Sequence, residues 1–123
     1  MLMKNLEIYD VATKLANAFN GDDVHLPIKV NFYLQKNKKA LINLSQDIEE
    51  ARTKIAATYG VLNEEGTSYI ISEEKIAEAS KELEDLFNLE QEVHIYKIQL
   101  EQIPEHIELS TAQMEALLFM VEE

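Results

Sequence analysis

The stretch from Ile28 to Tyr59 contains neither glycine nor proline, and this uninterrupted run constrains the fold more than any other feature. Pro27 suits the first turn of a helix, because a backbone N–H has no partner there in any case. Gly60 is typical of the residue at which a helix ends. From Leu34 onward, apolar residues recur at heptad spacing, as in helices that pack lengthwise against a partner. The sequence therefore predicts one long helix that opens at Pro27 and ends at Tyr59.

The apolar seam of this helix needs a partner, and the residues after Ser72 supply one. Ser72 is a suitable N-cap, and two acidic residues follow it in the first turn, where the helix dipole favours them. The stretches Leu41–Tyr59 and Glu73–Leu89 have matched lengths, which predicts an antiparallel helical hairpin about 25 to 28 Å long. The seams consist of Leu34, Leu41, Leu44, Ile48, Ala51 and Ile55 on the long helix and Ile76, Ala79, Leu83 and Leu86 on its partner.

Two stretches have the composition of β-structure. Between the predicted helices, Val61–Leu62 and Tyr69–Ile71 flank a polar turn, which indicates a small hairpin or an extended loop. Further along, Glu92–Leu100 mixes β-forming with polar residues and predicts one strand. We expect this strand to pair with Tyr69–Ile71.

Amphipathic helices are predicted at both ends of the chain. Asn5–Asn20 has an apolar stripe of period 3.6, with Asn5 as its N-cap and Asn20-Gly21 as its stop. Near the C-terminus, Ser110 and Gln113 form a capping box that opens the last helix. Its predicted buried stripe consists of Met114, Leu117, Leu118 and Val121.

These elements predict a single domain, residues 1–123, of mainly α class with a minor β part. In it, the antiparallel helical hairpin and a small β element pack with the N- and C-terminal helices. The chain has no cysteine, which excludes disulfide scaffolds, thiolate metal sites and cysteine nucleophiles and fits a reducing cytosol. No apolar run approaches about 18 residues, so no membrane span is expected. Acidic residues outnumber basic ones by 23 to 11, and the net charge of −12 argues against direct binding of nucleic acid or anionic membranes.

The charge is unevenly distributed along the chain. Residues 25–59 carry six basic and three acidic residues, whereas residues 60–123 carry sixteen acidic and three basic ones. Four lysines near the start of the long helix form a candidate contact patch for a partner: Lys29, Lys36, Lys38 and Lys39. We favour the alternative that these lysines neutralise acidic residues on the partner helix and so fix the pairing of the two helices. The acidic residues in question are Glu78, Glu82, Glu84 and Asp85.

Residue patterns that carry catalysis are missing from the sequence. None of the three histidines has a second histidine at i+3 or i+4, as a helix-borne metal pair requires. His94 and Tyr96 share a strand face if the strand is regular, but polar decoration explains them better than an acid–base pair. The nearest approach to a stacking platform for nucleic acid is Phe32-Tyr33 beside Lys36, which core packing explains more simply. We therefore predict no catalytic, cofactor-binding or metal-binding residue and no enzyme activity.

Two further features bear on partners. Phe119 and Met120 point away from the predicted buried stripe of the last helix and are candidate partner contacts. The seam from Leu34 to Ile55 is longer than Ile76–Leu86 can cover. Either the first and last helices cover the remainder or a second copy of the chain does, and we favour a homodimer.

Three groups of residues carry a resemblance to other proteins. They are Leu26-Pro27-Ile28-Lys29-Val30 with Lys36-Asn37 and Lys54–Gly60, then Glu92-Val93 with Lys97–Leu100, and finally Ile107–Ser110 with Met114, Leu117 and Phe119–Glu123. Together these residues resemble a group of small uncharacterised proteins encoded by tailed phages and prophages of Gram-positive bacteria. The resemblance covers most of the chain from Leu26 onward, and its motifs are mainly structural. It implies a phage product that acts in the host cytoplasm, and it transfers no activity or binding residue.

These considerations favour a non-enzymatic interaction protein that binds a host or phage protein. The leading hypothesis is inhibition of a host protein, because the acidic residues 60–123 can mimic the phosphate charge that a basic groove binds. The alternative is a phage assembly or morphogenesis factor, such as a small chaperone that covers apolar surface on a client. Early expression favours the first and late expression beside structural genes favours the second.

Overall fold

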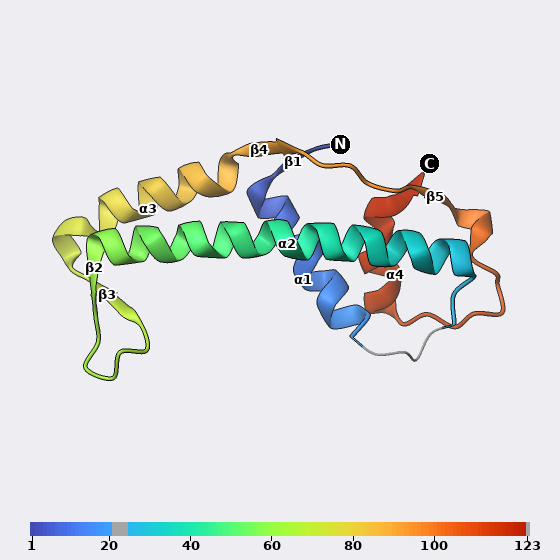
Figure 1. Cartoon of the computed structure of the whole chain (residues 1–123), viewed down its shortest axis with the longest axis horizontal. Helices are drawn as coiled ribbons and strands as arrows, with labels where there is room; N and C mark the ends of the chain where they lie inside the picture. Colours follow the sequence, from blue (N-terminus) through green and yellow to red (C-terminus); the bar gives the residue numbers. More distant parts are fainter. Residues whose placement is uncertain (21–24, 123) are drawn as a thin grey trace.

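One long helix organises the molecule. The computed structural model describes residues 1–20 and 25–122, and helix α2 (Ile28–Tyr59) runs along its whole length (Figure 1). The 32 residues of α2 correspond to about 48 Å. The helix ends at Gly60, where an added Cβ would lie 2.9 Å from the carbonyl oxygens of both Ala56 and Ile70. The predicted extent of the long helix is confirmed.

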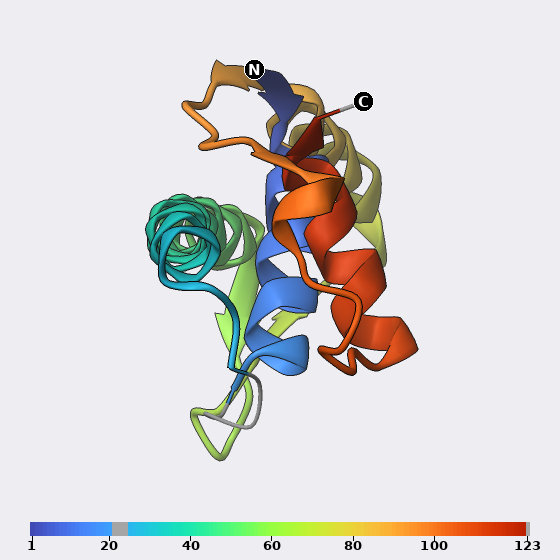
Figure 2. The same ribbon diagram turned by 90° about the vertical axis from the view of Figure 1, so that its right-hand side faces the viewer.

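The body of the molecule is built on the first half of α2. Helix α1 (Asn5–Ala18) lies between α2 and the C-terminal helix α4 (Thr111–Leu117), and it packs against both (Figure 2). Leu34 and Leu41 of α2 are almost fully buried in the core that these elements share. The part of the seam that α3 does not reach is therefore covered by the chain itself, which removes the reason to expect a second copy at that place.

The second half of α2 and helix α3 (Glu73–Asn88) form the predicted antiparallel helical hairpin (Figure 1). Strands β2 (Gly60–Leu62) and β3 (Tyr69–Ile71) connect the helices as an antiparallel β-hairpin. We call α3, this β-hairpin and the adjoining end of α2 the arm. Ala79 is the one α3 residue that is buried, and Ile76 is 47% exposed. The arm thus has a thinner core than the body.

The single strand predicted over Glu92–Leu100 is wrong, as is its pairing with β3. Strand β4 (Glu90–Glu92) pairs antiparallel with β1 (Leu2–Lys4), and β5 (Ile98–Gln99) pairs parallel with β6 (Val121–Glu122). Residues 93–97 between β4 and β5 form no strand. Val93 and Ile95 are buried there, and a side chain of α2 binds the backbone of Tyr96 in place of a neighbouring strand.

The N-cap predicted at Asn5 is also wrong, because Asn5 already belongs to α1, whereas an N-cap precedes the first helical residue. Asn5 is the first residue of α1 and is buried. Its Nδ2 donates to the carbonyl oxygen of Leu86 at 2.8 Å, and its Oδ1 accepts from Nε2 of Gln91 at 2.7 Å. Asn5 therefore joins α1 to the end of α3. The predicted helix stop is Asn20-Gly21, and its Gly21 lies outside the described residues.

The capping box of the last helix is confirmed, but the predicted buried stripe is partly wrong. The backbone N–H of Gln113 donates to the Ser110 hydroxyl at 3.1 Å, and the N–H of Ser110 donates to Oε1 of Gln113 at 2.9 Å. After Leu117 the chain tightens into a 3₁₀ turn, η2 (Leu118–Met120), which changes the angular spacing of the side chains. As a result, Leu118 is 67% exposed, and Met114, within α4 itself, is 57% exposed.

The prediction that Met120 is a partner contact is wrong, and the same change of helix type is the reason. Met120 is fully buried, at 0% exposure, and its sulfur accepts from Nδ2 of Asn37 at 3.6 Å. It belongs to the core and is not available to a partner on this fold. Phe119 is half-buried and packs against the same core.

Candidate functional site

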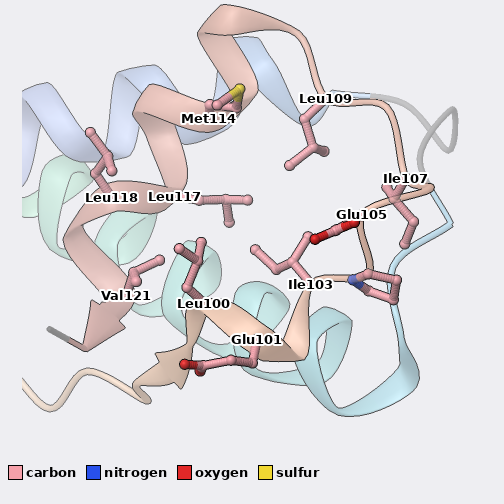
Figure 3. A pocket seen from close by; sticks show the side chains of 11 residues that line it. Leu100, Glu101, Ile103, Glu105, Ile107, Leu109, Met114, Leu117, Leu118 and Val121 are labelled. Atoms are coloured by element: carbon pink, nitrogen blue, oxygen red, sulfur yellow. The ribbon is translucent and has the colours of Figure 1, made fainter.

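An open apolar pocket lies between α4 and the loop that follows β5 (Figure 3). These elements stand at the end of the molecule where α2 begins (Figure 1). One wall is the loop that follows β5, with the 3₁₀ turn η1 (Leu100–Gln102), and the other wall is α4 with η2. The volume is about 710 Å³. We call it the C-terminal pocket. Its lining consists of Leu100, Glu101, Ile103, Pro104, Glu105, Ile107, Leu109, Met114, Leu117, Leu118 and Val121.

Local hydrogen bonds hold both walls of this pocket. In the loop, the N–H of Ile103 donates to the carbonyl oxygen of Leu100 and that of Ile107 donates to Pro104, each at 3.1 Å. In the helical wall, Nε2 of Gln113 donates to the carbonyl oxygen of Ala18 at 3.2 Å and so ties α4 to α1. The bonds of Ile103 and Ile107 brace the loop, and the lining of the pocket consists mainly of apolar side chains.

The rim of the C-terminal pocket is exposed, whereas its floor is buried. Leu100, Met114 and Leu118 are 66%, 57% and 67% exposed, and Leu117 beneath them is 2% exposed. Figure 3 shows Leu100 and Leu117 directed toward the space between the walls. Covering apolar area is favourable by roughly 25 cal/mol per Å², so these side chains gain from a partner. Exposed apolar patches around a hollow are typical of binding sites.

The pocket is acidic as well as apolar. Glu101 and Glu105 line it, and the residues from Ile98 to Glu122 include five glutamates and no lysine or arginine. The nearest lysine in the sequence, Lys97, donates from Nζ to the carbonyl oxygen of Phe119 at 2.7 Å. Among the described residues, the ion pairs are Met1–Glu92 and Arg52–Glu49, and none involves these five glutamates. The carboxylates around the pocket are therefore uncompensated.

The lysine patch lies elsewhere, on the first half of α2. Lys29, Lys36 and Lys39 are exposed, but Lys38 is half-buried and donates from Nζ to the carbonyl oxygen of Phe19 at 2.6 Å. These lysines stand at one end of α2, while α3 with its carboxylates lies beside the other end (Figure 1). The ion pairs named above do not join α2 to α3, so the expected neutralisation of α3 by these lysines is wrong.

An aromatic row accompanies the lysines, and the sequence did not reveal it. The ring centroids of Tyr33 and Tyr96 are 5.2 Å apart, and those of Tyr96 and His94 are 4.7 Å apart in an edge-to-face arrangement. Phe32, expected in the core, is 55% exposed, and Nζ of Lys36 lies 5.4 Å from its ring centroid. In the sequence, only the shared strand face of His94 and Tyr96 pointed to this row. The contact between Tyr96 and Tyr33 gave no sequence signal, because the two residues are more than sixty positions apart.

The arm presents a third surface. Val61 and Ile70 are directly opposite each other in the β-hairpin and are 71% and 59% exposed. The acidic residues of α3 are all exposed: Glu73, Glu74, Glu78, Glu82, Glu84 and Asp85. A hydrogen bond to Glu82, together with the negative charge nearby, raises the pKa of Tyr59 at the end of α2.

Chemistry-bearing residues do not gather in the described part of the chain. His25, His94 and His106 are exposed and lie on different segments. Within residues 1–20 and 25–122, no group of three metal-ligating side chains is close enough to hold an ion. Over the same ranges, no helix combines the length and apolarity needed to cross a membrane.

Comparison of the chain with known protein families, with curated proteins and with solved structures finds no match.

Proposed function

We propose that the protein is a non-enzymatic protein-interaction module that binds its partner through the C-terminal pocket. The observation that carries this proposal is the exposed rim of Leu100, Met114 and Leu118 over a buried floor. A site for a small ligand encloses most of its ligand, whereas this pocket is open between its walls. An open apolar hollow of this kind suits side chains that project from another protein.

The experiment compares two variants in the same tagged capture from host cells, with and without phage infection. Leu118→Asp places a charge on the pocket rim, and Ile28→Asp places one on a still more exposed apolar side chain of α2 outside the pocket. We expect Leu118→Asp to lose a specific partner that both the wild-type protein and Ile28→Asp retain, by at least about tenfold in recovery. Equal recovery by both variants would contradict binding through the pocket.

The partner is proposed to be a host protein that a phage product inhibits in the host cytoplasm. The origin rests on the resemblance of Leu26–Val30 and the other quoted residues to phage proteins. Inhibition by mimicry of phosphate charge is supported by the exposed carboxylates of α3. Such binding weakens steeply between about 50 and 500 mM salt, and an affinity that stays constant over this range contradicts mimicry.

The second candidate function is a phage assembly factor or small chaperone. It is supported by the exposed apolar side chains of the arm, which include Val61, Leu62, Ile70 and Ile76. These residues suit transient cover of apolar surface on a client. Recovery of phage structural proteins alone, and only during infection, favours this candidate. Recovery of a host protein without infection favours the inhibitor.

A further inference from the structure

We infer that the occupant of the C-terminal pocket is an amphipathic helix of the partner protein, with apolar anchors and lysine or arginine on its flanks. This inference rests on the proposed function, because it names the partner segment that the same pocket receives. Its basis is the combination of an apolar lining, carboxylates that form no ion pair among the described residues, and a wall of helical turns, α4 with η2, whose backbone bonds lie within those turns.

The carboxylates determine the charge of the occupant. Glu101 and Glu105 stand in the lining itself, and Glu108 and Glu115 lie on the loop and on α4. The ammonium group of Lys97 donates to the carbonyl oxygen of Phe119, and the ion pairs of the described residues do not join it to these carboxylates. An acidic segment or an apolar carboxylic acid would be repelled at this rim. A segment with lysine or arginine beside its apolar anchors gains attraction and a faster encounter.

The helical turns in the walls indicate the conformation of the occupant. An extended peptide needs a free strand edge, but one wall of the pocket is α4 with η2 and the other begins with the 3₁₀ turn η1. A partner segment that lies along such turns must satisfy its own backbone N–H and C=O groups. A helix does so, and it presents apolar side chains at i, i+3, i+4 and i+7 on one face. Such a face can contact Leu100 on one wall and Met114 and Leu118 on the other.

The test uses three synthetic peptides with the same leucine stripe at helical spacing. Their polar positions are filled by lysine, by glutamine or by glutamate. Each peptide carries a fluorophore, and its affinity for the full chain is measured by fluorescence anisotropy at low and high salt. We expect the lysine peptide to bind more tightly than the glutamine peptide and the glutamate peptide to bind least. High salt should strongly weaken the binding of the lysine peptide and not that of the other two.

Two matched double variants distinguish attraction by the carboxylates at the pocket from attraction by the net negative charge of the whole chain. E101Q/E105Q removes two charges at the pocket, whereas E64Q/E65Q removes two charges from the turn of the β-hairpin in the arm. We expect the first to weaken the lysine peptide about fivefold at low salt and the second to change its affinity less than about twofold. Leu118→Asp should abolish binding of both the lysine and glutamine peptides.

The outcomes distinguish this inference from the proposed function. Equal affinity for the lysine and glutamine peptides, or equal effects of the two glutamate pairs, overturns the basic helix. The basic helix is also wrong if Leu118→Asp loses a partner in cells but that partner contacts the pocket through an extended or acidic segment. In that case the proposed function, a protein-interaction module that binds through the pocket, still holds. If no peptide binds and Leu118→Asp loses no partner, both proposals are wrong.

Discussion

The side-chain amide of Asn37 binds both backbone groups of Tyr96. Its Nδ2 donates to the carbonyl oxygen and its Oδ1 accepts from the N–H, each at 2.9 Å. Asn37 is 1% exposed and lies on the buried seam of α2, where a heptad pattern would place an apolar residue. The bonds fasten residues 93–97 to the helix, and this link leads directly into β5 and the first wall of the pocket. A single polar side chain thus connects the long helix to the candidate site.

Asn37→Leu should destabilise the protein strongly. The leucine is similar in size, but it leaves the N–H and C=O of Tyr96 without their partners in a partly buried place. We expect a loss of about 2 to 4 kcal/mol in the free energy of unfolding, measured by urea denaturation. Asn43→Leu on an exposed position of the same helix is the control and should change the stability by less than about 0.5 kcal/mol. Equal effects of the two changes would contradict the role given to Asn37.

The two halves of the helical seam should respond differently to truncation. Leu41→Ala removes a side chain of 0% exposure from the body, and we expect a loss of about 2 to 5 kcal/mol. Ile76→Ala removes a side chain of 47% exposure from the arm, where a loss below about 1.5 kcal/mol is expected. Urea denaturation of both variants measures the difference. Similar losses would mean that the arm has a core as closed as that of the body.

The phenol of Tyr59 should resist ionisation. The hydrogen bond to Glu82 and the charges of Glu82 and Glu78 disfavour the phenolate, so its pKa lies above the usual 10.0. Because the folded-state pKa is raised, this contact stabilises the fold fully below pH 10 and is lost as the pH rises through the folded-state pKa. NMR titration of ring-labelled tyrosine measures the pKa of Tyr59. In Glu82→Gln the pKa should return toward 10.0, and an unchanged value would contradict this cause.

The homodimer remains a proposal and now rests on the arm rather than on the α2 seam. Val61 and Ile70 form an exposed apolar cross-strand pair that a second copy can cover. We expect light scattering to give a particle of about twice the chain mass of 14.1 kDa and V61E/I70E to give a monomer. A wild-type particle of 14.1 kDa would contradict the dimer.

Local sequence signals predicted the parts of the fold that depend on neighbouring residues. The run from Ile28 to Tyr59 became α2, and the capping box at Ser110 opens α4 as expected. The antiparallel helical hairpin followed from matched heptads in the two stretches. These features require only periodicity, caps and the absence of helix breakers.

Contacts between distant segments were not predictable in the same way. The pairing of β1 with β4 joins residues 2–4 to residues 90–92, and that of β5 with β6 joins residues 98–99 to residues 121–122, so each pairing spans a long stretch of chain and involves only two or three residues. The pocket was missed for a related reason. Its rim depends on the change from α to 3₁₀ geometry after Leu117, which buries Met120 and exposes Leu118. A stripe predicted with a constant helical period instead buries Leu118 and exposes Met120.

The most direct test of binding through the C-terminal pocket is to place a photo-crosslinking amino acid at position 118 or at position 28 and irradiate cells that make the protein. Leu118 lies on the pocket rim, and Ile28 is 88% exposed on α2 beside Lys29. We expect one discrete crosslinked protein from position 118, in lower yield when E101Q/E105Q is added, and none from position 28. Crosslinking from position 28 alone would contradict the pocket and move the contact to the lysine patch of α2.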